Sequence, residues 1–383
     1  MPDTINIGAN LSHNLVDTVY GDTSRSTMIV DLSAIQSNYR TLQALAPRSS
    51  CGAVVKADAY GLGAARIAPF LARLGCTQFF VTDVDEGIAM RGVLPSSATI
   101  YVLHGAMPGM EKAAEHHNLM PILNSREQLD GWLRHCRRRN QALPAGIHVD
   151  TGLSRLGFPI DELQTLAEKE TGLSELTTAL FMSQLACAEW KNEVSRQQLR
   201  RFRTLTHLFP KAILSLSNSA GLFAGRQFHF DLIRLGGGIF GFSTSDHPCF
   251  KPSQVVSLRT QIIQCRELTH GEAIGYHMSY KVKTRMRVAT ASFGYADGFP
   301  RILGNRGYVF IRGTRVAIVG FVSMDLMTID VTELPTSWTL PGTLVDLICP
   351  EQTVEDLASA ANMLSDELTT GIGPRCRRHY VQC

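Results

Sequence analysis

A lysine ends one of the apolar runs of the chain and is followed at once by a short polar loop. The run is residues 52–55, the lysine is Lys56, and Tyr60 lies four residues further on. A lysine in a partly dry site can lose its proton, and its amine can then form an imine with a carbonyl compound. The alternative is an ordinary lysine at the end of a strand, with its charged end in solvent.

Two later apolar runs end in residues suited to binding a phosphate group. Asn218 and Ser219 follow one run, and a serine hydroxyl beside backbone N–H groups can bind an anion. Gly236 and Gly237 follow the other run, where the missing side chains let backbone amides approach a ligand closely. The Asn-Ser pair or the glycines alone would be typical of a plain loop. Because both follow Lys56 at the ends of later apolar runs, they reinforce one another.

The elements that must position these residues alternate regularly along the chain. Short apolar runs occupy Met28–Leu32, Gly52–Lys56, Gln78–Asp83, Thr99–His104, Met120–Leu123, Gly146–Asp150, Thr178–Met182, Ile213–Leu216 and Leu232–Leu235. The segments between them carry apolar residues at the three- and four-residue spacing of helices. We therefore expect an α/β fold, an N-terminal (β/α)8 TIM-type barrel with its site residues at the C-terminal ends of the strands. A doubly wound open sheet is the alternative, but no Gly-x-Gly-x-x-Gly turn supports it.

The pattern changes after about residue 253. Residues there alternate or are β-branched, with turn residues between the runs, which is typical of a predominantly β domain. A helical piece, Val354–Leu364, follows near the end. We expect a polar N-terminal extension over residues 1–25, the barrel over 26–253 and a β-rich C-terminal domain over 254–383.

Composition excludes several classes of partner. The 383 residues carry a net charge of +3, with 44% hydrophobic and 19% charged residues, so we expect a globular protein with no nucleic-acid or membrane partner. The nine cysteines are odd in number and contain no Cys-x-x-Cys pair, which predicts reduced thiols and no metal site. No apolar stretch is long enough to span a membrane and no signal peptide is visible, so a cytoplasmic location is expected.

The string around the lysine resembles a known motif. Residues 53–61, Ala-Val-Val-Lys-Ala-Asp-Ala-Tyr-Gly, are similar to the cofactor-lysine motif of alanine racemases, which use pyridoxal 5'-phosphate (PLP). The resemblance extends from about Met28 to Tyr380. It implies that Lys56 holds PLP and that Tyr60 binds the phosphate together with Asn218, Ser219, Gly236 and Gly237.

The same resemblance implies that Arg234 faces the pyridine nitrogen of PLP. A guanidinium only donates hydrogen bonds and keeps its proton, so the ring nitrogen stays largely unprotonated. A carboxylate there would make the ring a stronger electron sink, and a barrel-type decarboxylase would want an acidic residue at this position. The alternative interpretation of Arg234 is a half-buried arginine in an ion pair with Asp231.

Further motifs imply the substrate contacts. Arg155, in residues 149–157, matches an arginine that approaches the substrate carboxylate, which suits its forked geometry. In the β-rich domain, Tyr276 matches the catalytic tyrosine, Tyr295 a residue that narrows the active-site mouth, and Met324 a residue whose backbone N–H contacts the carboxylate. In this family these last three enter the neighbouring subunit's site, so the resemblance implies a homodimer with shared active sites.

The implied activity is interconversion of L-alanine and D-alanine by two bases, Lys56 on one face of Cα and Tyr276 of the partner on the other. Such an enzyme is an isomerase that can supply D-alanine as a peptidoglycan precursor. A racemase of broader or different scope, for example toward serine, is the alternative. A non-catalytic PLP-binding protein is a further alternative, although single-domain carriers of that kind lack the β domain.

Several positions depart from the family pattern. Gln184 and Ser215 stand where many members carry histidines, and His148 stands where some carry a carbamylated lysine that steadies the arginine. Residues 61–63 read Gly-Leu-Gly instead of Gly-His-Gly, and residues 371–375 lack a tyrosine that some members use on the phosphate. These departures leave the lysine, the tyrosine and the pyridine arginine in place.

Overall fold

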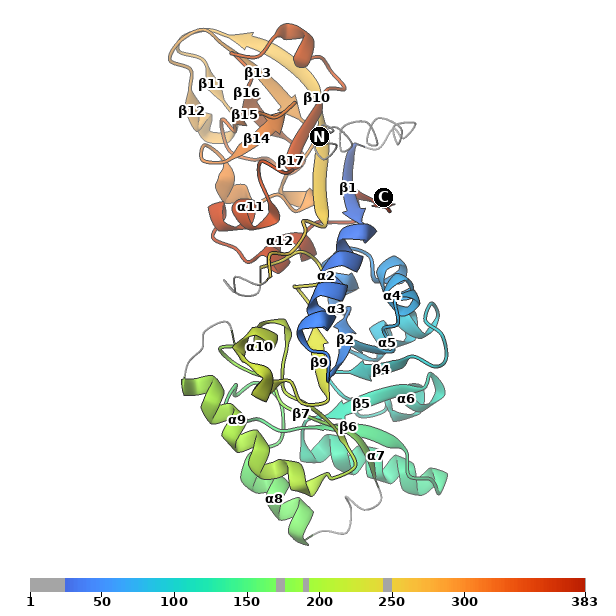
Figure 1. Ribbon diagram of the computed structural model, residues 1–383. Coiled ribbons are helices and arrows are strands. Elements are labelled where there is room, and N and C mark those ends of the chain that lie inside the picture. Colours follow the sequence, from blue (N-terminus) through green and yellow to red (C-terminus); the bar gives the residue numbers. More distant parts are fainter. Residues whose placement is uncertain (1–24, 170–175, 189–192, 244–249, 383) are drawn as a thin grey trace, which may run out of the picture. The chain divides into compact units, whose positions relative to one another are not determined.

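The computed structural model describes residues 25–169, 176–188, 193–243 and 250–382. The N-terminal extension expected over residues 1–25 lies outside the described residues except for Arg25. The chain forms two compact units (Figure 1). Among the described residues, one unit contains those within 29–256, 350–372 and 380–382, and the other contains 25–28, 257–349 and 373–379.

The first unit is built on a sheet of eight parallel strands in the order β8-β7-β6-β5-β4-β3-β2-β9. The strands are β2 (Ser50–Val54), β3 (Gln78–Val81), β4 (Thr99–Val102), β5 (Leu119–Leu123), β6 (Pro144–His148), β7 (Thr177–Met182), β8 (Ile213–Ser215) and β9 (Leu232–Leu235). The sheet closes between its two end strands, because the Asp231 N–H donates to the Leu214 carbonyl and the Arg234 N–H donates to the Ser217 carbonyl. The predicted barrel is therefore confirmed.

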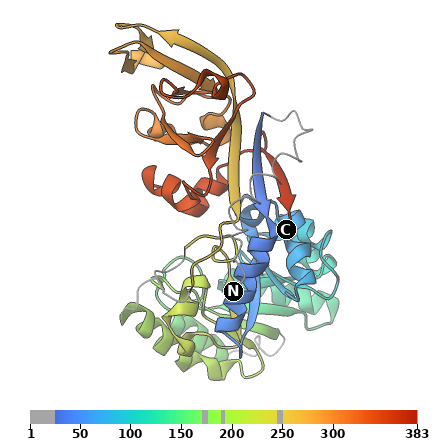
Figure 2. The same cartoon turned by 45° about the horizontal axis from the view of Figure 1, so that its top comes forward.

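Helices follow the strands and cover the outside of the barrel (Figure 2). They are α2 (Leu32–Leu45), α3 (Lys56–Tyr60), α4 (Ala64–Arg73), α5 (Val84–Arg91), α6 (Glu111–His116), α7 (Arg126–Arg139), α8 (Ile160–Lys169), α9 (Glu193–Leu205) and α10 (Ser219–Ala224). Side-chain caps start several of them, as sequence rules predict: Asp31 accepts from two backbone amides of α2, and Asp83 accepts from one amide of α5.

The barrel interior is packed with large side chains from six of its strands. A cluster of buried residues fills it: Val54, Phe80, Tyr101, Ile122, Leu180, Met182 and Leu232. Phe80 stacks on Tyr101 with ring centroids 4.6 Å apart. Gly52 leaves the room for this stack, because a Cβ there would lie 2.9 Å from Phe80. The interior is thus a core rather than a pore, and a ligand must bind at the mouth.

The second unit is mostly β structure, as predicted. Its strands are β10 (Val256–Leu268), β11 (Ala273–Ile274), β12 (Tyr280–Lys281), β13 (Met286–Ala291), β14 (Tyr308–Ile311), β15 (Thr314–Ala317), β16 (Met327–Asp330) and β17 (Leu344–Ile348). The main sheet follows the order β15-β14-β17-β10-β1-β18, with β13 pairing to β10 and β16 to β13. Strand β1 (Ser26–Asp31) is the first apolar run of the sequence, and it belongs to this sheet instead of the barrel.

The helices after β17 group with the barrel. They are α11 (Val354–Ala360) and α12 (Ser365–Thr370), and the compact unit of the barrel includes residues 350–372. The short strand β18 (Arg377–Val381) ends the described chain. The chain therefore passes from one compact unit to the other at several points, and not only near residue 253.

Three observations concern the whole described chain. Every cysteine in it is a free thiol. No helix within the described ranges is both long enough and apolar enough to cross a membrane. Those same ranges contain no group of three or more His, Cys, Asp or Glu residues that could hold a metal ion.

Candidate active site

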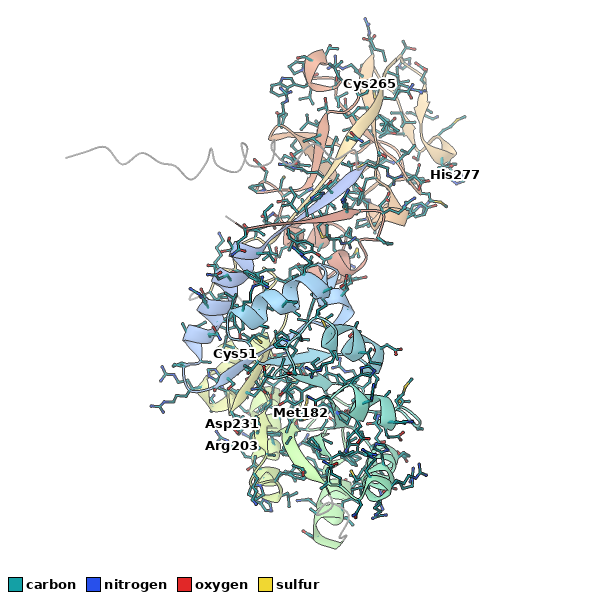
Figure 3. The ribbon with its side chains drawn as sticks, turned by 90° about the vertical axis from the view of Figure 1, so that its right-hand side faces the viewer. Cys51, Met182, Arg203, Asp231, Cys265 and His277 are labelled. Carbon is teal, nitrogen blue, oxygen red and sulfur yellow. The ribbon has the colours of Figure 1, made fainter. Side chains whose placement is uncertain are left out.

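A cavity of about 1100 Å³ opens at the C-terminal ends of the barrel strands. Met182, at the end of β7 and labelled in Figure 3, is one of its lining residues. The lining also includes all the barrel residues that the sequence predicts for the site: Lys56, Tyr60, Arg155, Asn218, Ser219, Arg234, Gly236 and Gly237. Parallel strands bring their C-terminal ends to one mouth, which explains how residues so far apart in sequence meet.

Lys56 begins a left-handed turn. Strand β2 ends at Val54, and the four residues after Lys56, Ala57 to Tyr60, have φ angles between 50° and 59°. The ψ angles of Ala57, Asp58 and Ala59 are positive as well. The turn is therefore left-handed, a conformation that L-residues disfavour. The sequence predicted a short polar loop here and gave no sign of this conformation.

Tyr60 ends the turn with its ring packed on two phenylalanines. The ring centroids of Phe240 and Phe242 lie 5.0 and 6.2 Å from that of Tyr60. Burial, and then the nearby Asp366 carboxylate, raise the pKa of Tyr60, so its hydroxyl remains a hydrogen-bond donor at neutral pH. A Cβ at Gly236 would lie only 2.3 Å from this hydroxyl, so the close approach requires glycine.

Ser219 connects the ends of β8 and β9. Its hydroxyl oxygen accepts a hydrogen bond of 2.9 Å from the Gly236 N–H, and its own proton is then available for a ligand. Asn218 instead caps α10, accepting from the Gly221 N–H at 2.8 Å. The amide of Gly236, expected to approach a phosphate directly, is therefore committed to Ser219.

Arg234 lies at the base of the cavity and is only 3% exposed. Its guanidinium donates to neutral acceptors: the Ser215 hydroxyl at 2.5 Å, the Ser183 carbonyl at 2.7 Å, the Gln184 side-chain oxygen at 2.9 Å and the Leu216 carbonyl at 3.2 Å. Burial lowers the pKa of Arg234, which still leaves it charged at neutral pH.

The alternative ion pair between Arg234 and Asp231 is not formed. The Asp231 carboxylate accepts a hydrogen bond of 2.8 Å from the Leu214 N–H, and no carboxylate of the described chain pairs with Arg234. Gln184 and Ser215, the two departures from the family pattern, are both acceptors for this arginine. They orient the guanidinium without neutralising it.

His148 is buried beside the arginine and is neutral. Burial lowers its pKa to about 3; the Arg234 charge and, less strongly, Arg155 act in the same direction, while Asp150 opposes them. Nδ1 lies 2.7 Å from the side-chain oxygen of Asn124, whose amide group donates to backbone carbonyls. Nδ1 therefore carries the proton, and Nε2 is a hydrogen-bond acceptor at the cavity wall.

Arg155 lies on the exposed loop after β6 and reaches the cavity lining. The Asp150 carboxylate holds this loop by accepting from the amides of Gly152, Leu153 and Ser154 at 2.8 to 3.0 Å. Burial opposes ionisation of Asp150, but these three hydrogen bonds outweigh it and lower its pKa. Arg155 forms no ion pair with any residue that the structure describes.

The remaining predicted site residues lie in the β-rich unit. Tyr276 is 70% exposed, on a turn next to His277, which is labelled in Figure 3. Tyr295 and Met324 lie on two loops that pair with each other, since the Tyr295 N–H donates to Ser323 at 3.0 Å and the Ala296 N–H to Met324 at 2.9 Å. The structure thus brings Tyr295 and Met324 together.

A buried carboxylate fixes these two loops. Asp297 accepts from the Gly294 N–H at 2.9 Å and forms ion pairs with Arg25 and Arg375. Arg375 also pairs with Asp325, which follows Met324, at 2.7 Å. Arg375 therefore ties both loops together.

Two groups of residues near the cavity escaped sequence analysis. Helices α11 and α12 and the segment between them contribute Glu355, Ser359, Asn362, Asp366 and Glu367 to the lining. Glu86 accepts hydrogen bonds beside the lysine turn. The helical pattern after residue 350 was visible in the sequence, but nothing in it specified packing against the barrel.

Comparison with known proteins gives a consistent family. Residues 30–244 match the alanine racemase N-terminal domain and residues 255–380 match the alanine racemase C-terminal domain. The chain is 40% identical over 356 residues to the catabolic alanine racemase of Agrobacterium fabrum, covering 93% of this chain and 92% of that protein. It is 39% identical to the alanine racemase of Rhodospirillum rubrum, covering 94% and 96% respectively.

Solved structures agree. The alanine racemase from Bartonella henselae with covalently bound pyridoxal phosphate superimposes with a TM-score of 0.89 at 36% identity, covering 94% of this chain and all of that one. The biosynthetic alanine racemase from Pseudomonas aeruginosa gives a TM-score of 0.84 at 30% identity over 94% of this chain and all of its own. The chain therefore belongs to the alanine racemase family, the PLP-dependent isomerases that act on alanine.

Proposed function

We propose that the chain racemises alanine with two bases, Lys56 of one subunit and Tyr276 of a second copy. The observation that carries the proposal is the convergence of Lys56, Tyr60, Ser219 and Arg234 on one cavity of the barrel. Family membership supplies the reaction, and the cavity supplies the groups that the reaction requires.

The cavity residues fit PLP. Lys56 offers the amine for the aldehyde carbon, and the hydroxyls of Tyr60 and Ser219 offer donors to the phosphate. The space between Gly236 and Tyr60, which a Cβ would fill, keeps those donors close together. When bound, PLP supplies the electron sink that stabilises negative charge at the substrate Cα.

Arg234 would hold the pyridine nitrogen. Its donors are fixed by four neutral acceptors and its charge has no carboxylate partner in the described chain. A nitrogen that faces a donor-only group stays unprotonated, which limits how far charge spreads from Cα. The arrangement favours return of a proton to Cα over side reactions such as transamination.

Racemisation needs a proton acceptor on one face of Cα and a proton donor on the other. Lys56 serves one face. Among the described residues, Tyr60 is the tyrosine that lines the cavity, but its hydroxyl lies beside Gly236 and is assigned to the phosphate. We assign the second role to Tyr276, whose exposure of 70% leaves it accessible to another subunit.

The substrate carboxylate would be bound by Arg155 and by the backbone N–H of Met324. Neutral His148 leaves the positive charge of Arg155 for the carboxylate, because it adds neither a further charge nor a counter-ion. Tyr295, paired by its loop to Met324, would narrow the mouth. A homodimer with reciprocal sites follows from this division of residues.

The metabolic role that we propose is supply of D-alanine for peptidoglycan precursors in the cytoplasm. Relatives carry both catabolic and biosynthetic designations. Expression in a bacterial strain that requires D-alanine tests the proposal: growth without added D-alanine supports it, and failure despite measured racemase activity contradicts it.

The reaction is tested by incubating the protein and PLP with a panel of L-amino acids and resolving the products on a chiral column. D-alanine should form fastest. Faster formation of D-serine or another product would favour a racemase of different scope. Bound PLP without any D-amino acid would favour a non-catalytic PLP-binding protein.

A further inference from the structure

We propose that Glu86 is a positioning residue that holds the lysine turn in its left-handed conformation. The inference rests on the proposed function of Lys56 and Tyr60, because its consequence is the placement of these two side chains. Glu86 itself takes no part in the proposed reaction.

The turn is costly in isolation. Ala57, Asp58, Ala59 and Tyr60 all have positive φ angles, and none of them is glycine. Each L-residue is less stable in this conformation than in the right-handed one, because its Cβ crowds the following carbonyl oxygen. A run of such residues persists only when the surrounding structure determines it.

The backbone of the turn satisfies part of this requirement itself. The Ala59 N–H donates to the Val55 carbonyl at 2.9 Å, and the Gly61 N–H donates to the Ala57 carbonyl at 2.8 Å. The Asp58 carboxylate accepts from the Ala64 N–H at 2.7 Å and so connects the turn to α4. These bonds close the turn and connect it to α4, and none of them uses the Ala57 N–H.

Glu86 fixes the start of the turn. One of its carboxylate oxygens accepts from the Ala57 N–H at 2.7 Å, directly after Lys56. The other oxygen accepts from the Thr82 N–H, also at 2.7 Å, directly after β3. A single carboxylate therefore joins the ends of two neighbouring barrel strands at the residue that follows the lysine.

Glu86 is itself well placed for this role. It lies in the first turn of α5, where its own N–H donates to the helix cap Asp83 at 3.0 Å. Helix α5 packs on the barrel through buried Val84, Gly87 and Met90. The carboxylate therefore extends from a fixed helix to a strained turn, which is how an active site keeps side chains in a defined geometry.

The test compares Glu86→Ala and Glu86→Gln with a matched control, Asp31→Ala. Asp31 is likewise a half-buried carboxylate of the barrel unit that accepts from two backbone amides, at 2.7 and 3.1 Å, but these amides belong to the start of α2 and not to the lysine turn. The measurements are the PLP dissociation constant of the apoprotein by equilibrium dialysis, kcat and KM for L-alanine at saturating PLP, and the melting temperature.

Glu86→Ala should weaken PLP binding by about tenfold or more, the usual effect of losing hydrogen bonds to a charged group. It should also lower kcat while KM for alanine stays within about twofold, because Lys56 is misplaced and Arg155 is not. Glu86→Gln keeps one acceptor oxygen for two amides, so its effects should be intermediate. Asp31→Ala should lower the melting temperature and leave PLP binding and kcat within about twofold.

Wild-type PLP affinity and kcat in Glu86→Ala would overturn the inference, and so would an equal loss of PLP affinity in Asp31→Ala. Reduction of the wild-type holoenzyme with borohydride, followed by peptide mapping, separates the two proposals. Pyridoxyl on Lys56 together with unaffected Glu86 variants overturns this inference alone. Pyridoxyl on another lysine overturns the proposed function and this inference with it.

Discussion

Arg234 and Tyr276 represent two contrasting halves of the proposed site. Arg234 is 3% exposed and its donors are committed to fixed acceptors, so the barrel sets its position within one chain. Tyr276 is 70% exposed, on a turn of the β-rich unit whose next two residues have positive φ angles. In the proposed site, folding alone thus preorganises the cofactor residues, whereas Tyr276 would acquire its surroundings only in the proposed dimer.

The largest effect should come from the barrel half. Lys56→Ala should lower racemase activity by about 1000-fold or more, because it removes both the attachment point for PLP and one base. Borohydride reduction should then label no lysine. Lys211→Ala is the control, since Lys211 is exposed in the same unit and does not line the cavity, and it should leave activity unchanged. Full activity in Lys56→Ala would contradict the assignment of Lys56, and with it the comparison between the two halves of the proposed site.

Tyr276→Phe tests the half that depends on assembly. The variant should lose about 100- to 1000-fold in kcat, since only the phenolic proton is removed. Tyr308→Phe, another exposed tyrosine of the same unit, should be neutral.

Mixing the two inactive proteins sharpens this prediction. Refolding Lys56→Ala and Tyr276→Phe together makes half the dimers mixed, each with one intact site, so activity should recover to about a quarter of wild type. No recovery in verified heterodimers would show that each chain completes its own site.

Arg234→Glu should slow racemisation by about 100-fold and introduce slow formation of pyruvate from alanine. The substituted carboxylate favours a protonated ring nitrogen, which opens the transamination that the arginine disfavours. Pyruvate is measured with lactate dehydrogenase, and the melting temperature is recorded in parallel because Ser215 and Gln184 lose their donor. Unchanged rate and product would mean that Arg234 does not face the ring.

His148 predicts a pH dependence of stability. Its pKa is about 3 in the folded protein, below the ordinary value of 6.5, so the unfolded chain binds the proton more readily as pH falls through 6.5. The folded state should lose about 2 kcal/mol between pH 7 and pH 5 from this group alone. His148→Gln should remove that loss, measured as the difference in unfolding free energy between the two pH values. An undiminished difference would contradict the neutral assignment.

The smallest effect should come from Arg375, which is partly exposed. Arg375→Ala removes the ion pairs to Asp297 and Asp325 and loosens the loops of Tyr295 and Met324. KM for alanine should rise about two- to threefold with kcat nearly unchanged, because buried Asp297 keeps its ion pair with Arg25 and the exposed pair with Asp325 contributes little. A loss of kcat as large as that of Tyr276→Phe would mean that the β-rich half is as preorganised as the barrel.

The barrel and the residues at its mouth could be predicted from the sequence because their signals are local. Each signal is contained in a short stretch of sequence: the apolar runs of strand length, Gly236 after β9, and the string around Lys56. The alternation does not show which runs pair with each other. The first run, which becomes β1, looks like a barrel strand but pairs in the other sheet.

The details that were missed depend on contacts between distant residues. The residue types of Ala57, Asp58 and Ala59 do not favour a left-handed turn, and the contact that Glu86 makes with Ala57 comes from a residue 29 positions away. The partners of Arg234 could not be predicted either, because Asp231 is closer in sequence than Gln184. Sequence identified the chemical groups, and tertiary packing determined their neighbours.

The close approach of Gly236 to Tyr60 has a consequence for how the protein can evolve. A methyl group at 236 and the hydroxyl at 60 compete for one space, and the ring at 60 cannot retreat because Phe240 and Phe242 pack on it. A lineage can therefore acquire alanine at 236 only after the residue at 60 has become smaller. The two positions form an epistatic pair, in which the effect of a substitution at 236 depends on the residue at 60.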